Sequence, residues 1–285
     1  MQIAVASGKG GTGKTTIALS LAYFFKEENL KVAILDCDVE EPNVNLFLNL
    51  KIQEEKSCNV MVPYIDKSLC SACGECERIC QFSAIVLVKG KPLFFPEMCH
   101  SCGGCTLICP EKAIKEIARE TAKIEISQKD NLFFAGGKLN IGEAMSPPVI
   151  RQVKENFIDA DIRIIDSPPG TSCPVIESVR EANFLILVTE PTPFGLNDLS
   201  LAIEMARALK IPSAVVINKS SKSDYLIKDL CKQVNIPIIG AIPEDREIAE
   251  NYSKGEFISV VKEKYNAQFK EIINHIKNFR RIYNS

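Results

Sequence analysis

The sequence contains no tryptophan and only two histidines, His100 and His275, so we expect no catalytic site built on histidine. It also carries little net charge, because 34 Lys and Arg residues oppose 36 Asp and Glu residues and leave −2. Such a balance produces no overall field that attracts nucleic acid or an anionic membrane. We therefore expect no nucleic-acid partner.

Long apolar runs are absent too. No segment approaches the ~20 apolar residues that span a bilayer. The first residues pass from an apolar run directly into a glycine-rich loop, without the basic start, apolar stretch and cleavage site of a secretory leader. These features predict a cytoplasmic location and exclude transmembrane classes.

Cysteine, in contrast, is abundant and clustered. Eight of the 12 cysteines lie between Cys70 and Cys109, and the others are Cys37, Cys58, Cys173 and Cys231. A small secreted protein would use scattered cysteines for disulfides, and this pattern does not fit one. The chain of 285 residues, with 46% hydrophobic and 25% charged residues, is long enough for one medium domain plus a small one.

Short, nearly continuous runs of Val, Ile, Leu and Ala predict strands that are covered on both faces. A segment of helical spacing separates the first two runs, and helix-compatible segments separate the later ones. This alternation predicts an α/β fold with a doubly wound, mostly parallel sheet. The predicted strands are 2–6, 32–37, 162–165, 184–188, 213–217 and 236–241.

Between about residues 59 and 120 the pattern changes to short cysteine-rich loops with a possible hairpin at 85–95. The block repeats itself at an offset of 29 residues, since the Cys70–Ile85 pattern recurs from Cys99 to Ile114. We therefore predict a duplicated module inserted into the α/β domain. The predicted divisions are 1–58 and 121–285 for the two parts of the α/β domain, and 59–120 for the insert.

The segment GKGGTGKT, residues 8–15, fits the phosphate-binding motif G-x-x-x-x-G-K-[ST] between a predicted strand and a predicted helix. Glycines allow backbone N–H groups to converge on phosphate oxygens at the positive end of the helix dipole. Lys14 would reach the β- and γ-phosphates, and the Thr15 hydroxyl would bind magnesium. A merely glycine-rich turn would leave both residues unexplained.

With its additional Lys9, the loop resembles the deviant Walker A motif of the MinD/ParA superfamily, which includes the nitrogenase iron protein. Further segments resemble this family: Asp36-Cys37-Asp38 its D-x-D, Asp166-Ser167-Pro168-Pro169-Gly170 its Walker B and switch segment, and Asn218 with Pro243-Glu244-Asp245 its base-binding positions.

The resemblance implies a dimeric ATPase that uses ATP/ADP and magnesium, in which Lys9 crosses to the partner's nucleotide. Asp38 would position the attacking water, and Asp166 would hold magnesium through its water shell, as phosphoryl transfer requires. A solvated strand end is the alternative reading of Asp36 and Asp38. The implied catalytic residues are Lys9, Lys14 and Asp38; the implied nucleotide contacts are Gly8, Gly10, Gly11, Thr12, Gly13, Lys14, Thr15, Thr16, Asn218, Pro243 and Asp245; and the implied magnesium residues are Thr15, Asp38 and Asp166.

The spacing C-x2-C-x2-C-x3-C occurs twice and resembles bacterial ferredoxins that hold two 4Fe-4S clusters, in which the last cysteine of each run ligates the other cluster. The resemblance implies two ligand sets. Cysteine pairs also suit zinc, although eight thiolates in this duplicated pattern favour iron and sulfur. Clusters that only staple a small insert are another alternative. The first set is Cys70, Cys73, Cys76 and Cys109, and the second is Cys99, Cys102, Cys105 and Cys80.

The remaining isolated residues indicate less. For Cys173 we favour a buried thiol over a ligand of a cluster that bridges a dimer, and Cys37, Cys58 and Cys231 are predicted to be structural. His100 lies between two of the proposed ligands and is a candidate to tune a cluster, whereas His275 is predicted on the surface.

Both sites together resemble MinD-superfamily ATPases that carry an inserted ferredoxin domain. The leading hypothesis is an ATPase, a homodimer or a heterodimer with a related ATPase, that couples nucleotide-driven closure to electron transfer with a redox partner. A carrier that donates clusters to an accepting protein is one alternative, and a MinD-like positioning ATPase with a redox-sensing insert is another. The amphipathic C-terminal segment fits either a helix packed on the sheet or one that lies on a membrane.

Overall fold

The computed structural model describes the backbone of residues 1–48 and 50–283. In this part of the chain a main sheet of nine strands has the order β11-β10-β9-β1-β8-β2-β7-β6-β3, and β4 and β5 form a separate hairpin. The strands are β1 (Gln2–Ala6), β2 (Val32–Asp36), β3 (Glu54–Ile65), β4 (Ile85–Val88), β5 (Lys91–Phe94), β6 (Ile114–Lys129), β7 (Leu132–Leu139), β8 (Ile162–Asp166), β9 (Phe184–Thr189), β10 (Ser213–Ser220) and β11 (Ile238–Pro243).

The six strands that the sequence predicted are all present and run parallel to one another, and β7 pairs parallel with β2 and antiparallel with β6. The expectation of a mostly parallel α/β sheet is therefore confirmed. Every residue of β1, β2 and β9 is buried, as continuous apolar runs require in a sheet covered on both faces.

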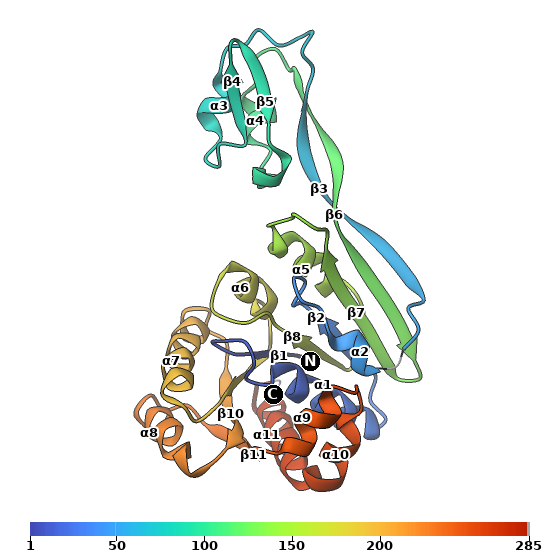
Figure 1. The fold of residues 1–285 in the computed structure, drawn as a ribbon, viewed down its shortest axis with the longest axis vertical. Helices are drawn as coiled ribbons and strands as arrows, with labels where there is room; N and C mark the ends of the chain where they lie inside the picture. The colour runs from blue at the N-terminus through green and yellow to red at the C-terminus, as the bar shows by residue number, and fades with distance from the viewer. Residues whose placement is uncertain (49, 284–285) are drawn as a thin grey trace.

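Helices cover both faces of the parallel part of the sheet, and each layer encloses its own apolar core (Figure 1). One core contains α1, α10 and α11, and the other contains α5, α6, α7 and α8. The helices are α1 (Lys14–Glu27), α2 (Val44–Leu48), α3 (Glu75–Ile79), α4 (Gly104–Ile108), α5 (Ser146–Lys154), α6 (Cys173–Val179), α7 (Pro193–Ala208), α8 (Tyr225–Gln233), α9 (Arg246–Tyr252), α10 (Phe257–Lys264) and α11 (Asn266–Tyr283), with 3-10 turns at Pro96–Met98 and Lys222–Asp224.

Helix α11 explains the amphipathic pattern of the C-terminal segment. Its apolar residues Phe269, Ile272, Ile273 and Ile276 are buried in the first core, so this stripe packs against the sheet and α1 and is not a free membrane-binding face. Among the described helices, none has the length and apolar character needed to cross a bilayer.

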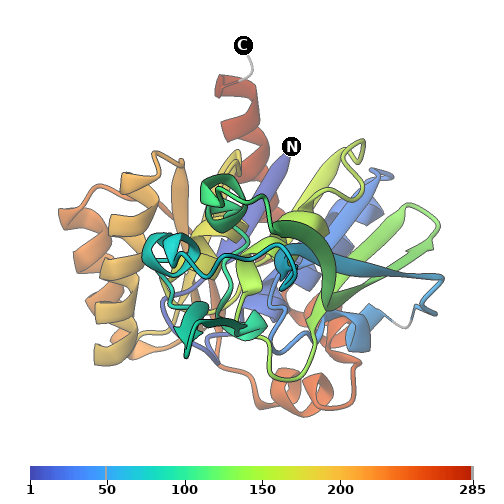
Figure 2. The same cartoon turned by 90° about the horizontal axis from the view of Figure 1, so that it is seen from above.

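Strands β3 and β6 form a long antiparallel ribbon that the sequence did not predict. The half of the ribbon nearer the sheet pairs with β7, and the other half extends beyond the body of the molecule (Figure 1), so that it overlies the body in the view from above (Figure 2). A shift of register lies between Cys58 and Asn59, opposite Thr121, where β6 has one extra residue. Such a bulge bends and twists a ribbon. The predicted divisions at 58/59 and 120/121 fall at this bulge.

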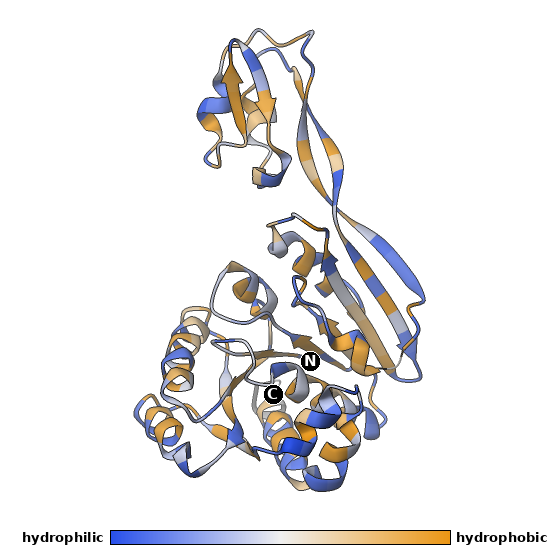
Figure 3. Ribbon diagram, in the orientation of Figure 1, coloured by the Kyte–Doolittle hydropathy of each residue, from blue (hydrophilic) through white to orange (hydrophobic). Residues whose placement is uncertain are grey.

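The ribbon ends in a small unit, residues 66–113, which contains α3, α4 and the hairpin β4–β5; the predicted hairpin is confirmed. Its buried apolar core is small and consists of Cys76 and Ile85 together with Ile114, the first residue of β6, and a few half-buried neighbours. Hydropathy differs accordingly: continuous hydrophobic strands run through the body, whereas polar and apolar residues are mixed along the ribbon (Figure 3). The unit therefore has little of the apolar packing that stabilises the α/β domain.

Candidate functional site

The glycine-rich loop connects β1 to α1 at the carboxyl edge of the sheet. Gly13 has a φ of 87°, and a Cβ atom built there would lie 2.2 Å from the Asn218 side-chain nitrogen. A residue other than glycine would therefore clash and be strained. That nitrogen donates a hydrogen bond to the Thr12 carbonyl oxygen at 2.8 Å. Asn218, which the resemblance assigns to contacts with the nucleotide base, therefore also bonds to the loop itself.

A cleft of about 790 Å³ opens in front of this loop, within the range of small-molecule sites. Most residues that the sequence proposed for nucleotide binding line it. The structure adds α9 residues that no local motif indicated, Arg246, Ile248 and Tyr252. The predicted residues on the wall of the cleft are Gly10, Gly11, Gly13, Lys14, Thr15, Thr16, Asp38, Asn218, Pro243 and Asp245; Gly8, Lys9, Thr12 and Asp166 lie outside this lining.

The carboxyl groups of Asp36, Asp38 and Asp166 lie near one another where β2 and β8 end. The Thr15 hydroxyl donates to Asp166 Oδ2 at 2.6 Å, while the buried Asp166 Oδ1 has no hydrogen-bond partner among the described residues. Burial raises the pKa of Asp38 and of Asp166 to about 6, and burial lowers the pKa of Lys14. Burial makes the ionised form of these carboxyl groups costly, and Lys14 offsets only part of that cost. A divalent cation bound here would stabilise the ionised carboxylates.

Asp36 has a structural role that its resemblance to the D-x-D motif did not predict. Its carboxylate is buried and accepts hydrogen bonds from the backbone N–H groups of Asp38, Asn43 and Val44, at 3.2, 3.0 and 3.0 Å. Burial raises its pKa well above the ordinary value, and the neighbouring Asp166 adds to the effect. Asp36 therefore braces the loop that carries Asp38, and it is not the solvated strand end that was the alternative.

Two further residues beside the loop, Glu190 and Lys219, belong to none of the sequence motifs. Glu190, at the end of β9, pairs with the ammonium of Lys9 and with Lys219 Nζ, the latter at 3.0 Å. Lys219 Nζ also donates to the Gly11 carbonyl oxygen at 3.0 Å. Glu190 follows β9 and Lys219 is the next-to-last residue of β10, at the same edge of the sheet as the loop, and this position is the sequence signal that could have identified them.

The segment after Asp38 contacts the end of β7 and the start of α5, and β7 pairs with the ribbon. The Leu139 N–H donates to the Val39 carbonyl oxygen, and the Ser146 hydroxyl at the start of α5 donates to Glu40. Between Leu139 and Ser146 lies Glu143, whose carboxylate binds the Arg119 guanidinium of β6 through two hydrogen bonds. A continuous set of contacts therefore joins the edge of the cleft to the ribbon.

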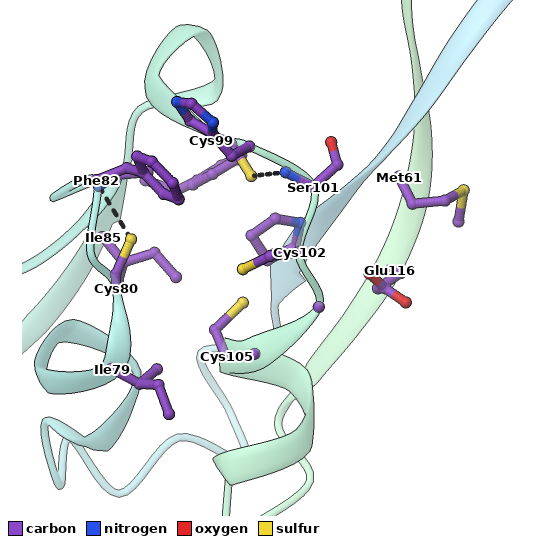
Figure 4. Close-up of a pocket in the computed structure, with 16 residues that line it drawn as sticks. Met61, Ile79, Cys80, Phe82, Ile85, Cys99, Ser101, Cys102, Cys105 and Glu116 are labelled. Carbon is purple, nitrogen blue, oxygen red and sulfur yellow. Dashed lines mark hydrogen bonds between the residues drawn. The ribbon is translucent and has the colours of Figure 1, made fainter. Parts of the chain in front are cut away.

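In the small unit, the sulfur atoms of four cysteines face one hollow (Figure 4). They belong to Cys80, Cys99, Cys102 and Cys105, the second set that the spacing implied. Backbone N–H groups point at two of them, from Ala84 to Cys80 Sγ at 3.3 Å and from Ser101 to Cys99 Sγ at 3.5 Å.

The second hollow is lined by the other set, Cys70, Cys73, Cys76 and Cys109. The 29-residue repeat of the sequence is also a repeat of the backbone, because left-handed φ values recur at matching positions in both runs. The pairs are Ala72 and Ser101, at 57° and 54°, Gly74 and Gly103, at 83° and 70°, and Ser83 and Lys112, at 52° and 51°. Both halves of the unit are therefore shaped in the same way around their cysteines.

Outside these hollows, Cys37, Cys58 and Cys231, which were predicted to be structural, are buried. The prediction for Cys173 is wrong: this thiol is exposed, because it begins the short helix α6 directly after a loop at the edge of the sheet. His275 is exposed as expected. His100 lines the second-set hollow and stacks on the Phe82 ring with 3.4 Å between ring centroids.

Among the described residues, no three His, Cys, Asp or Glu side chains converge tightly enough to surround one metal ion. The parallel sheet, the glycine loop before α1 and the cleft at the carboxyl edge together define a P-loop nucleotide-binding protein.

The family model described as the CobQ/CobB/MinD/ParA nucleotide binding domain matches residues 3–258, and the chain belongs to this family. An uncharacterized protein of Methanocaldococcus jannaschii is 32% identical over 265 residues, which cover 90% of each chain. The iron-sulfur cluster carrier protein of Aquifex aeolicus is 26% identical across 90% of this chain and 61% of its own length. The fold is also that of the septum site-determining protein MinD of Pyrococcus horikoshii, solved with Mg-ADP, with a TM-score of 0.60, 20% identity, and coverage of 99% and 97%.

Proposed function

We propose that the protein is a dimeric ATPase that carries two 4Fe-4S clusters in an inserted ferredoxin-like domain, residues 59–120, and couples nucleotide-dependent conformational change to electron transfer. The observation that carries this proposal is the pair of four-thiol hollows at the end of a ribbon that pairs with β7, whose last residue is bonded to the segment after Asp38.

In the nucleotide half, the loop amides and Lys14 bind the phosphates, and Asn218, Pro243 and Asp245 hold the base. Magnesium fits here, since Thr15 already bonds Asp166 and the second oxygen of that buried carboxylate lacks a protein partner among the described residues. The ion would offset negative charge on the phosphates. Asp38 orients the attacking water, and Lys9 stabilises the charge that develops on the partner subunit's nucleotide.

In the cysteine half, the donor set fits iron and sulfur. Each hollow offers four thiols, and backbone N–H groups aim at Cys80, Cys99 and Cys109, as they do toward the sulfur of cluster sites. A four-iron cube is held at its corners, so its ligands surround a volume and do not converge on one point. The clusters would supply one-electron transfer, and they would also stabilise a unit whose apolar core is too small to do so.

The coupling we propose runs through the ribbon. Asp38 senses the nucleotide, and the adjacent Val39 and Glu40 are bonded to the end of β7 and the start of α5. The Glu143–Arg119 ion pair then fixes the ribbon just beyond the bulge at Thr121. A movement of the Asp38 segment would therefore tilt the ribbon and reposition the clusters.

The test is an anaerobic preparation in which iron and sulfide are counted and an EPR spectrum is recorded. We expect about eight irons and eight sulfides for each chain, from two four-iron clusters. Redox titration should then give cluster potentials that differ with and without Mg-ATP. Preparations without inorganic sulfide, or calorimetry without heat on adding Mg-ATP, would end the proposal, whereas equal potentials in both states would remove the coupling alone.

The alternative function is a cluster carrier, which the name of the Aquifex aeolicus relative favours. Carriers of this superfamily resemble the chain in fold but use an exposed cysteine pair near the C-terminus, whereas here the only cysteine after Cys173 is the buried Cys231. Transfer of a cluster to an apo-protein, measured by the gain of the acceptor's activity, would establish this function instead. A positioning ATPase is less favoured because the stripe of α11 is buried, and ATP-dependent liposome binding would test it.

A further inference from the structure

Lys9, the lysine that marks the deviant loop, is bound to its own chain. Its ammonium pairs with Glu190, whose side chain is only 12% exposed and also binds Lys219. Lys219 in turn donates to the carbonyl oxygen of Gly11 within the phosphate loop. One carboxylate thus connects both lysines in front of the loop.

The backbone holds Glu190 in a fixed position. Its carbonyl oxygen accepts a hydrogen bond from the Thr192 N–H at 2.8 Å, and a Cβ atom at Gly195 would lie 2.2 Å from the same oxygen. Only glycine therefore permits this turn. Helix α7, which the turn begins, packs closely on the loop, since a Cβ at Gly8 would lie 2.5 Å from Asp198 Cβ. The turn between β9 and α7 therefore fixes the backbone of Glu190 beside Lys9.

We propose that Glu190 is a positioning residue that retains Lys9 on its own chain while the subunit is open and releases it when the nucleotide-bound dimer closes. The inference rests on the proposed function, in which Lys9 acts on the partner's nucleotide. A lysine that is paired with Glu190 cannot reach across at the same time, so retention opposes closure.

Release is feasible because Glu190 keeps a partner. After Lys9 leaves, Lys219 Nζ still binds the carboxylate, so no unpaired charge is left in a mostly buried position. Lys9 is about one third exposed, and pairs of such exposure contribute up to about 1 kcal/mol, which corresponds to roughly fivefold in an equilibrium constant. The retention is strong enough to hold the open subunit and weak enough to be overcome by nucleotide.

The test is Glu190→Gln, which removes the charge and keeps the shape of the side chain. Because both subunits of the dimer would release a lysine, we expect the protein concentration for half-maximal ATPase activity to fall about two- to thirtyfold. The same shift should appear in the dimer population measured by analytical ultracentrifugation with Mg²⁺ and a non-hydrolysable ATP analogue. Glu27→Gln is the matched control, since Glu27 pairs with Lys262 on the surface, and its midpoint should equal that of the wild type.

An unchanged or raised midpoint in Glu190→Gln overturns the inference. Glu190→Asp keeps the charge on a shorter side chain and should give a midpoint between those of the wild type and Glu190→Gln; if Glu190→Gln does not fold, the Asp variant decides. Lys9→Ala separates the two proposals: wild-type hydrolysis in Lys9→Ala refutes the role of Lys9 in the partner's site. Loss of hydrolysis in Lys9→Ala together with an unshifted Glu190→Gln midpoint refutes the retention alone.

Discussion

The Arg119–Glu143 ion pair provides the most direct test of whether the nucleotide cleft controls the cysteine unit. Arg119 lies on β6 just beyond the bulge, and Glu143 lies in the segment that joins β7 to α5. Replacing either residue with alanine would leave the cleft and the cysteines in place and remove this ion pair from the contacts that join them. We expect Arg119→Ala and Glu143→Ala to reduce the effect of nucleotide on the cluster potentials while hydrolysis continues.

The structure sets the size of this effect. The two side chains are 23% and 9% exposed and form two hydrogen bonds, one of 3.0 Å between Arg119 Nη1 and Glu143 Oε2. Exposed pairs contribute about 0.2–1 kcal/mol and breaking a buried pair costs about 3–5 kcal/mol, so about 1–2 kcal/mol suits this intermediate case. Since ~59 mV corresponds to ~1.4 kcal/mol for one electron, the pair can transmit at most about 40–85 mV.

The assay is anaerobic redox titration with and without Mg-ATP for wild type, each alanine variant and the charge exchange Arg119→Glu with Glu143→Arg. The exchange should recover part of the shift, because it restores the attraction in reverse. Lys123→Ala is the matched control, since Lys123 is on the same strand and pairs with Glu120 at the surface. A full nucleotide-dependent shift in Arg119→Ala would refute this route.

Three further predictions concern the two sites separately. Lys14→Ala should lower ATP hydrolysis by at least about 100-fold because it removes charge stabilisation at the phosphates, and iron and sulfide counts should stay unchanged; loss of iron would show that the modules do not fold independently. Cys76→Ser should lose a cluster while calorimetry still detects Mg-ATP binding, and Cys173→Ser, which changes an exposed thiol outside both hollows, should retain all the iron. Asp36→Ala should lower the free energy of unfolding in urea by about 2–4 kcal/mol because three backbone N–H groups lose their acceptor, and Asp36→Asn by less than half as much. Equal losses in the two Asp36 variants would mean that the charge of Asp36, and not its accepting oxygen, braces the loop.

Much of the fold follows from short-range pattern. The apolar runs at 2–6 and 184–188 became β1 and β9 because short, nearly continuous apolar runs suit strands buried on both faces. The ribbon of β3 and β6 escaped prediction because its outer half faces solvent, so polar and apolar residues mix without a clear period. The exposure of Cys173 was mispredicted for a related reason. The residues next to Cys173 in the sequence do not show that the loop before α6 leaves this thiol uncovered at the edge of the sheet.

By itself, the sequence determined those parts of the protein whose chemistry depends on residues close together in the chain. Among them are the strand–loop–helix around Gly13 and Lys14 and the two cysteine runs, since neighbouring positions settle their backbone geometry. Only the tertiary structure decided that Glu190 meets Lys9 and that Glu143 meets Arg119. Partners of this kind lie 24 to 181 residues apart, and they come together through the order of strands in the sheet and the packing of its layers, which no local pattern encodes.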